Sequence, residues 1–484
     1  MTPGKIFLYG LCFLIIIFLI SLVFPTDGWK IKNHIFYFPD HTSWYPDKPA
    51  YKDIQKIIAS IDTSDFDFIT DTVASIIPDS VQMLADTLRG PMPIDSVYTY
   101  TYPFEYPEGQ DTLLYPFFRT INILNKKDKP VRILHYGDSQ IEGDRITSAI
   151  RNYMQKKFGG RGCGLIPVVP VTDAARTFQQ DIPEKWVRLS LLDRKGDSLV
   201  QHRKFGIAGA LSRYMPADST DTITHIGLKP IYFGYKNARY FTHVKLFYGT
   251  SANMLSVIVN KTDTQQLNTQ PLISSFEWKS GKRQTSFHIS MHSRSFPDIY
   301  GIALDGDKGI AVDNIPLRGS TGSDFTRMNK EQFHQMFQMM DVEMVILQFG
   351  ANAVMNITDN YDYYYKSMTR QLKMMKSLKP ELAIVIIGVG DMSQNTAKGY
   401  KSYPHLNKVR DAQRKAALDN GCIFWDLYEA MGGEDSMPSW VLADPPLAQK
   451  DFVHFTYTGA RIVGELFCRA WTKDYLAYMK DVHH

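Results

Sequence analysis

A serine in the first third of the chain and a histidine near its end stand in settings that suit nucleophilic catalysis. Ser139 lies in Gly137-Asp138-Ser139-Gln140, directly after the apolar run VRILHYG. Asp451 stands three residues before His454, so its carboxylate can hold the imidazole Nδ1–H and leave Nε2 free as a base. A serine hydroxyl needs such a base to attack an ester. The alternatives are a capped turn for the serine and a histidine that caps the last helix.

Two further residues would supply hydrogen-bond donors beside this serine. Gly319 follows a second strand-like run, and Asn352 follows a third. Because the carboxyl ends of parallel strands meet at one edge of a sheet, both should lie near Ser139. The N–H groups of Ser139 and Gly319 and the Asn352 amide would then form an oxyanion hole. Taken alone, these residues are equally a turn glycine and an Asx-turn asparagine.

The elements that must position these residues alternate along the chain. Short apolar runs are separated by segments with helical periodicity, which predicts an α/β fold with a parallel sheet and helices on both faces. The apolar runs cover 131–137, 309–315, 343–350, 383–390 and 422–427. The helical segments cover 141–158, 328–340, 362–378 and 404–419, and a last helix comes after them.

The interval between the first two runs has a different pattern. Residues 241–248, 254–261 and 285–292 alternate apolar and polar side chains with a period of two. Short turn segments separate them, which is typical of an antiparallel β-sandwich. We therefore expect a sandwich over 172–308, inserted between the first and second strands of the α/β unit.

The order of these motifs resembles the SGNH (GDSL-like) hydrolase superfamily. The resemblance covers about 111–171 and 309–480 and implies a three-layer α/β/α fold with a flavodoxin-like parallel sheet. It also implies that Ser139 is the nucleophile, His454 the general base and Asp451 the residue that orients it. Ser139, Gly319 and Asn352 would form the oxyanion hole. Two departures are Gln140, where leucine or histidine is frequent, and Ala353, where aspartate is usual.

A narrower likeness concerns LHYGDSQIEGDRIT, the downstream KKFGGRGCG and the inserted sandwich. Together they resemble the peptidoglycan O-acetylesterase branch, in which the insertion is similar to a carbohydrate-binding module. This implies an O-acetylated cell-envelope glycan as substrate. The expected domains are an SGNH domain in two parts, 111–171 and 309–484, around the insertion.

The N-terminus carries an unbroken apolar stretch from Ile6 to Phe24. A membrane-spanning helix needs about 20 such residues, whereas the apolar core of a cleaved signal peptide has about 7–15. We therefore expect a transmembrane signal anchor over 1–24 and a membrane-proximal stalk over 25–110. The predicted location is the cytoplasmic membrane, spanned once, with the catalytic domain on the extracytoplasmic (periplasmic) side.

Composition excludes several other classes. The 484 residues carry 54 Lys and Arg against 50 Asp and Glu, a balance that offers no footprint for nucleic acid. The four cysteines, Cys12, Cys163, Cys422 and Cys468, stand too far apart for a CxxC zinc site or a disulfide scaffold. Whether any of the last three pair is left open. We expect no cofactor and no metal.

Three functions remain open. The first is an esterase that removes O-acetyl groups, and the second is an O-acetyltransferase that uses the same triad beside a membrane-bound O-acyltransferase. The third is a non-catalytic glycan-binding anchor. Charged neighbours of the motifs have two interpretations each. Glu142, Asp144 and Arg145 either form a salt-bridged helix start or contact substrate, and Arg318 either binds an acidic sugar or caps a carbonyl.

Overall fold

The computed structural model describes residues 3–23, 29–31, 34–36, 52–59, 101–172, 177–231 and 233–483. Contacts divide the chain into one compact unit of Met1–Lys52 with Ala397–Gly399 and a second of Asp53–Thr396 with Tyr400–His484. The first unit contains α1 (Pro3–Val23) and an antiparallel pair, β1 (Trp29–Ile31) and β2 (His34–Phe36).

The expected membrane anchor is not supported. Within the described ranges, no helix combines the length and the apolar character that a membrane crossing requires. The transmembrane assignment of 1–24 is corrected accordingly. Most of the predicted stalk over 25–110 lies outside the described residues.

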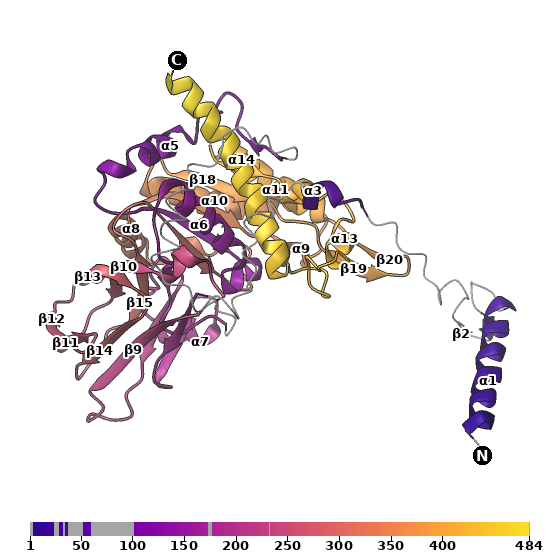
Figure 1. Ribbon diagram of the computed structural model, residues 1–484, viewed down its shortest axis with the longest axis horizontal. Coiled ribbons are helices and arrows are strands. Elements are labelled where there is room, and N and C mark those ends of the chain that lie inside the picture. The colour runs from indigo at the N-terminus through magenta and orange to yellow at the C-terminus, as the bar shows by residue number, and fades with distance from the viewer. Residues whose placement is uncertain are drawn as a thin grey trace, which may run out of the picture. The chain divides into compact units, whose positions relative to one another are not determined.

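The larger unit is built on a six-stranded sheet with the order β16-β4-β17-β18-β21-β3. Its strand β18 is labelled in Figure 1. Five strands are parallel, and β3 runs antiparallel to its neighbour β21. When the five parallel strands are numbered by their order along the chain, their order across the sheet is 2-1-3-4-5. This is the flavodoxin-like arrangement that the resemblance implies. The strands are β3 (Phe104–Glu105), β4 (Val131–Gly137), β16 (Ile310–Pro316), β17 (Val342–Gln348), β18 (Ala383–Ile387) and β21 (Ile423–Trp425).

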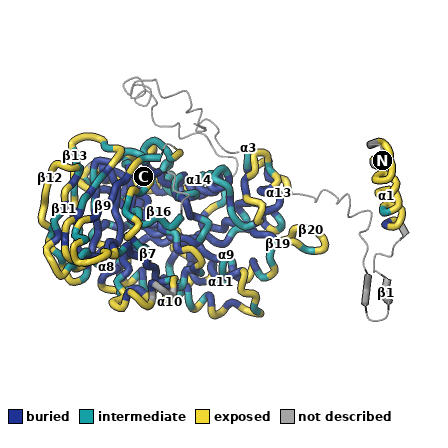
Figure 2. The backbone as a smooth tube through the Cα atoms, turned by 90° about the horizontal axis from the view of Figure 1, so that it is seen from below, coloured by how far each residue is buried: buried dark blue, intermediate teal, exposed yellow. Residues whose placement is uncertain are grey.

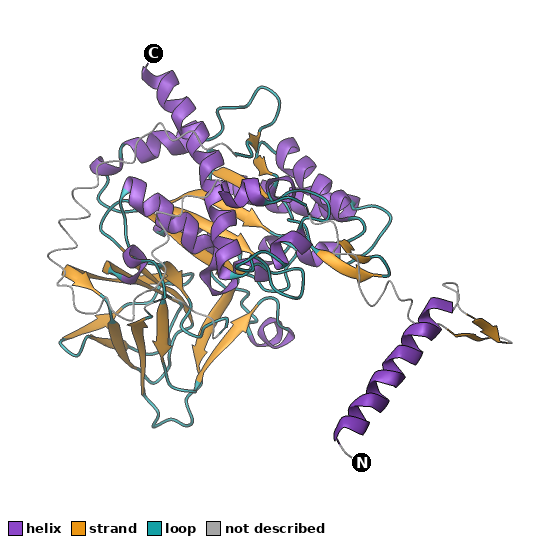
Figure 3. Cartoon of the chain, turned by 45° about the vertical axis from the view of Figure 1, so that its right-hand side comes forward, coloured by secondary structure: helices purple, strands orange, loops and turns teal. Residues whose placement is uncertain are grey.

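Helices cover both faces of this sheet (Figure 3). Alternate side chains of a strand point to opposite faces, so Met344 and Ile346 of β17 enter one core cluster and Val345 and Leu347 the other. The three-layer architecture is therefore as predicted. One face packs against α5 (Tyr115–Asn122), α6 (Arg145–Phe158) and α14 (Tyr457–His483), and the other against α8 (Lys330–Met339), α10 (Asp362–Leu378) and α11 (Leu406–Asp419).

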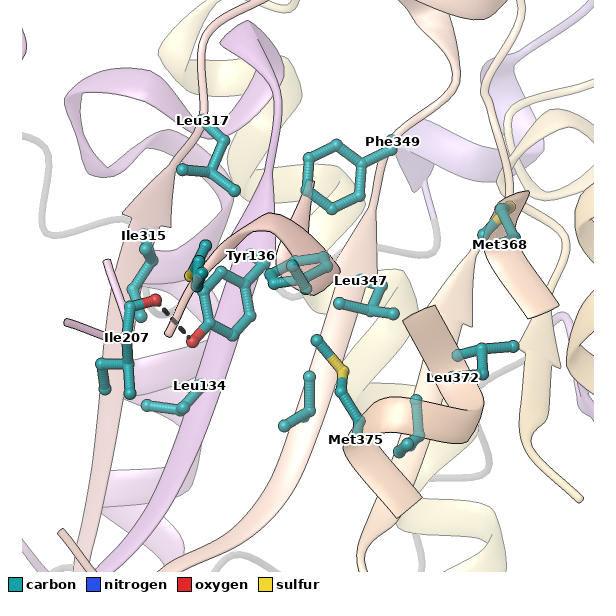
Figure 4. Packing of buried hydrophobic residues seen from close by; sticks show 14 of the residues in the cluster. Leu134, Tyr136, Ile207, Ile315, Leu317, Leu347, Phe349, Met368, Leu372 and Met375 are labelled. Atoms are coloured by element: carbon teal, nitrogen blue, oxygen red, sulfur yellow. Dashed lines mark hydrogen bonds between the residues drawn. The ribbon is translucent and has the colours of Figure 1, made fainter. Parts of the chain in front are cut away.

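The core cluster that contains Val345 and Leu347 continues into the insertion. Tyr136 of β4 is fully buried and donates a hydrogen bond from its hydroxyl to the carbonyl oxygen of Ile207, at 2.9 Å (Figure 4). On the same face, Leu347 packs in one cluster with Leu372 and Met375 of α10. In Figure 2 the buried residues, drawn in dark blue, run through the interior of the larger unit.

The insertion between β4 and β16 is a sandwich of two antiparallel sheets. One sheet has the order β13-β10-β15-β8-β7, with β5 paired to β15, and the other β12-β11-β14-β9-β6. Its first strand, β5, already begins at Gly164, ahead of residue 172 where the sequence analysis places the boundary. The strands are β5 (Gly164–Ile166), β6 (Phe178–Asp181), β7 (Trp186–Ser190), β8 (Ala210–Tyr214), β9 (Ile223–Pro230), β10 (Phe241–Tyr248), β11 (Leu255–Val259), β12 (Asp263–Leu267), β13 (Ser274–Gln284), β14 (Phe287–His292) and β15 (Ile299–Asp305), with α7 (Arg194–Leu199) beside them.

A buried ionic triad joins the sandwich to the parallel sheet. Arg132 of β4 donates hydrogen bonds to Asp313 of β16, at 2.6 Å, and to Asp305 of β15. Asp313 also accepts the backbone N–H of Leu165, in β5, at 3.0 Å. All three charged side chains are buried. Removing one partner would leave an uncompensated buried charge, so the triad fixes the insertion on its sheet.

The remaining described elements are short. They are α3 (Gln55–Ala59), η3 (Leu124–Lys126), η4 (Ser139–Asp144), η5 (Lys236–Arg239), η6 (Phe325–Arg327), α9 (Ala351–Val354), β19 (Ser393–Thr396), β20 (Gly399–Ser402), α12 (Leu427–Ala430) and α13 (Met437–Val441).

Candidate active site

Ser139 lies at the carboxyl end of β4, as the first residue of η4. Strand β4 is flanked by β16 and β17, and the strand order reverses there. Open α/β sheets bind their ligands at such a switch point. The turn is tight, since a Cβ on Gly137 would stand 2.9 Å from the carbonyl oxygen of Gln348. The fold therefore presents the serine hydroxyl at the edge where a ligand is expected.

The structure brings the predicted serine, histidine and aspartate together. Ser139 Oγ lies 2.8 Å from His454 Nε2, and His454 Nδ1 lies 2.7 Å from Asp451 Oδ2. Both distances are those of normal hydrogen bonds. The imidazole nitrogen beside the hydroxyl can therefore accept its proton, while the carboxylate holds the opposite nitrogen.

Asp451 also organises the backbone around the histidine. Its Oδ1 accepts the N–H groups of Val453 and His454, each at 3.0 Å. Partial burial opposes ionisation, but the hydrogen bonds from His454 and Val453 outweigh it and lower the pKa of Asp451. The carboxylate is thus held in its charged form, which suits a partner for an imidazolium.

The loop that carries the histidine is fixed from several sides. Phe452 has a φ of +58°, a conformation that costs an L-residue roughly 1–2 kcal/mol. Its ring stacks on Tyr400, with centroids 3.5 Å apart, and its carbonyl accepts the N–H of Ser393 at 2.9 Å. On the other side, Gln140 Nε2 donates to the carbonyl of Val453 at 2.7 Å. These contacts stabilise the strained turn and hold the ring of His454 in place.

The expected oxyanion donors come from the two strands that flank β4. Gly319 follows β16 with a φ of +82°, and a Cβ there would meet nothing within 4 Å. Asn352 follows β17, and its Nδ2 donates to the carbonyl of Ser320 at 3.0 Å, which anchors the Gly319 turn. Within the described residues, the backbone N–H groups of Ser139 and Gly319 have no acceptor. They are therefore available to a substrate oxygen.

Asp138 links two of these turns, and it takes the capping role that the sequence also allows for this turn. Its carboxylate accepts the N–H of Gln140 at 3.0 Å and the N–H of Ala351. Burial raises the pKa of Asp138 to about 6, against these hydrogen bonds and the nearby His454. The only sequence signal for this role is its place beside Ser139.

The other charged neighbours take structural positions. Arg145 donates to the carbonyl oxygen of Ser139, and burial lowers its pKa. Asp144 forms an ion pair with Arg151 at 2.6 Å, as expected for a salt-bridged helix start. Glu142 is buried and faces Arg318 Nε at 3.6 Å.

A recess opens beside the serine. It encloses about 340 Å³ of empty space, part of it open to solvent, and Asp138, Gln140 and Asp391 are among its lining residues. Burial raises the pKa of Asp391 to about 6. Nowhere in the described ranges do three or more His, Cys, Asp or Glu side chains gather as a metal site. The four cysteines are all unpaired.

Comparison with known proteins matches part of the chain to one family. Residues 283–462 match the GDSL-like Lipase/Acylhydrolase family, a range that contains Gly319, Asn352, Asp451 and His454 but not Ser139. No curated protein matches the chain.

Among solved structures, one titled as a peptidoglycan O-acetylesterase superposes with a TM-score of 0.61 and 21% identity, over 75% of this chain and 96% of that one. A salicylyl-acyltransferase of a tetracycline pathway covers 63% of this chain and 96% of its own, at 9% identity and a TM-score of 0.28. An acetyl xylan esterase covers 33% and 81%, at 16% identity and a TM-score of 0.27. The first of these establishes the shared fold, and the other two are too distant to bear on function.

Proposed function

We propose that this chain, whose residues 283–462 match the GDSL-like Lipase/Acylhydrolase family, is a serine esterase that removes O-acetyl groups from a cell-envelope polysaccharide such as peptidoglycan. The observation that carries the proposal is the hydrogen-bonded line from Ser139 Oγ through His454 to Asp451, with distances of 2.8 and 2.7 Å. The likeness to a solved structure titled as a peptidoglycan O-acetylesterase supports the choice of ester.

The proposed reaction begins when His454 Nε2 accepts the hydroxyl proton of Ser139. The freed Oγ attacks the acetyl carbonyl carbon, and a tetrahedral oxyanion forms. The N–H groups of Ser139 and Gly319 and the Asn352 amide stabilise this negative charge. The intermediate then expels the sugar oxygen, which takes the proton from His454 and leaves as a hydroxyl group.

The second half of the reaction regenerates the serine. Ser139 now carries the acetyl group as an ester. His454 removes a proton from a water molecule, the resulting hydroxide attacks the acetyl carbon, and a second oxyanion forms in the same place. Its collapse releases acetic acid and returns the proton to Ser139 Oγ. In both halves Asp451 keeps Nδ1–H of the ring hydrogen-bonded and stabilises the imidazolium.

Solvent access to the site favours hydrolysis over acetyl transfer to a sugar. The side chains of His454 and Asp451 are 28% and 45% exposed, and Ser139 is half-buried. An acetyl transferase must keep water from the acyl-enzyme, whereas this site lies open to it. The O-acetyltransferase is therefore the second candidate. A membrane-bound O-acyltransferase partner and the extracytoplasmic location stay predictions from sequence.

The test uses the purified full chain with an aryl acetate and with an O-acetylated glycan, each with and without a sugar acceptor. We expect free acetate from both substrates, and its loss in Ser139→Ala and His454→Ala. Acetylated acceptor that forms faster than acetate would establish the transferase instead. Equal activity of wild type and Ser139→Ala would overturn the proposal.

A further inference from the structure

A second feature of the larger unit has no part in the reaction above. Arg188 lies on β7 of the sandwich, and its Nε is buried without a hydrogen-bond partner. In the part of the chain that the structure describes, its guanidinium forms no hydrogen bond and no ion pair, and burial lowers its pKa. The side chain as a whole is half-buried, and a charge that is partly removed from water without a partner is costly unless something else satisfies it.

Arg188 lines a groove between the sandwich and the parallel sheet. The groove encloses about 450 Å³ of empty space, part of it open to solvent. Ser212 and Tyr300 line it on the sandwich side, and Asn314 and Pro316 of β16 on the sheet side. Most of the remaining lining is apolar, which strengthens any charge interaction inside it. Pro316 stands three residues before Gly319, so β16 leads from this groove toward the oxyanion donors.

The acidic residues near Arg188 do not neutralise it by direct contact. Glu142 and Asp193 act on it electrostatically from farther away. Glu142, three residues after Ser139, lies against Arg318 Nε instead, at 3.6 Å, and Asp193 is exposed. The guanidinium therefore still offers its donors to a ligand in the groove, within electrostatic reach of Glu142 in η4, the element that begins at Ser139.

We propose that Arg188 binds a carboxylate of the substrate in this groove, so that the esterase acts on an acidic glycan. The proposal rests on the proposed function for the identity of the reaction, but the binding site does not depend on it. The planar guanidinium matches a carboxylate with two parallel hydrogen bonds. A singly charged group also suits the site better than a phosphate dianion, which Glu142 would repel more strongly.

Binding of unreactive ligands tests this directly. Calorimetric titration of the wild-type chain would compare N-acetylmuramic acid and glucuronic acid, which carry a carboxylate in different places, with uncharged N-acetylglucosamine and with inorganic phosphate. We expect at least one of the two sugar acids to bind at least about tenfold more tightly than N-acetylglucosamine and than phosphate, the range of one charge-assisted pair. Which acid binds identifies the position of the carboxylate.

The variant Arg188→Gln should remove the preference for the sugar acid. Arg188→Lys should keep part of it, because lysine retains the positive charge but cannot form the two parallel hydrogen bonds of a guanidinium. The matched control is Lys229→Gln, which removes an exposed cation from the other sheet of the sandwich and should leave the preference intact. Thermal unfolding of each variant establishes that it is folded.

Two results would overturn the inference. One is a wild-type chain that binds both sugar acids no more tightly than N-acetylglucosamine, or that binds phosphate best. The other is a folded Arg188→Gln that keeps the preference. None of these measurements requires turnover, so loss of the carboxylate site and failure of the esterase assay are separate outcomes.

Discussion

The side-chain amide of Gln140 donates a hydrogen bond to the backbone carbonyl of Val453, 2.7 Å away. This contact joins the residue after the proposed nucleophile to the residue before the proposed base. It stands where the related sequences frequently carry leucine or histidine, so this departure has a structural role. Gln140 is a positioning residue, because it acts on His454 through the loop.

Replacing Gln140 tests that role. We expect Gln140→Leu to lower kcat by about tenfold with little change in KM, because a misplaced base slows proton transfer more than binding. Gln140→Glu retains an acceptor but not the donor and should not restore the rate. A kcat unchanged in Gln140→Leu would show that the loop holds His454 without this bond.

Asp451 gives a sharper test of the histidine's environment. In Asp451→Asn, the side chain can still accept backbone N–H groups but cannot stabilise an imidazolium, so kcat should fall by about 10²- to 10⁴-fold. The free energy of unfolding should change less than in Asp451→Ala, which also loses the bonds from Val453 and His454. Steady-state kinetics beside urea unfolding separates the two effects. A loss of less than about fivefold would remove Asp451 from the mechanism.

Asn352 tests the oxyanion hole. Asn352→Ala removes one donor and should lower kcat by about 10²- to 10³-fold while KM stays nearly constant. Because Asn352 also anchors the carbonyl of Ser320, part of the loss could come from a displaced Gly319 turn. The matched control is Asn356→Ala. Asn356 follows α9, and its side-chain amide donates to the Tyr363 hydroxyl. The kcat of this variant should match that of the wild type. Equal losses in both variants would contradict a specific role for Asn352.

The raised pKa of Asp138 should make the free energy of unfolding depend on pH. Its pKa rises to about 6 in the folded protein, from an ordinary value of 3.8 for an aspartate. A carboxyl group with a raised folded pKa stabilises the fold while protonated, and this contribution is lost as the pH rises through about 6. Between pH 4.5 and 7.5 the loss amounts to about 2 kcal/mol.

The variant Asp138→Asn removes this titration. Urea unfolding at the two pH values should show that the variant gains about 2 kcal/mol relative to wild type on going from pH 4.5 to 7.5. Asp391, whose pKa is also raised to about 6, titrates in both proteins and cancels in the comparison. A difference between the proteins that does not vary with pH would contradict the raised pKa.

Much of this architecture can be predicted from the sequence, because strand periodicity and motif order are local signals. The parallel sheet, its helices and the sandwich follow from apolar patterns, and the placement of Ser139 and Asn352 at one sheet edge follows from the strands before them. The membrane helix is a prediction that the structure does not support.

The contacts that complete the site are not local. Gln140 and Val453 are 313 positions apart, and no periodicity links them. Arg188 stands on β7, and no pattern in the sequence shows that its Nε will be buried without a hydrogen-bond partner. The raised pKa of Asp138 depends on its burial, so it emerges only when the sheet is assembled.

The central claim is that His454 activates Ser139 as a nucleophile. The most direct measurement is covalent labelling of the full chain with phenylmethylsulfonyl fluoride, followed by intact mass and peptide mapping. The account predicts a single label on Ser139, loss of aryl acetate hydrolysis in proportion to labelling, and no label in His454→Ala. Labelling at another serine, or full hydrolysis by a chain completely labelled at Ser139, would contradict it.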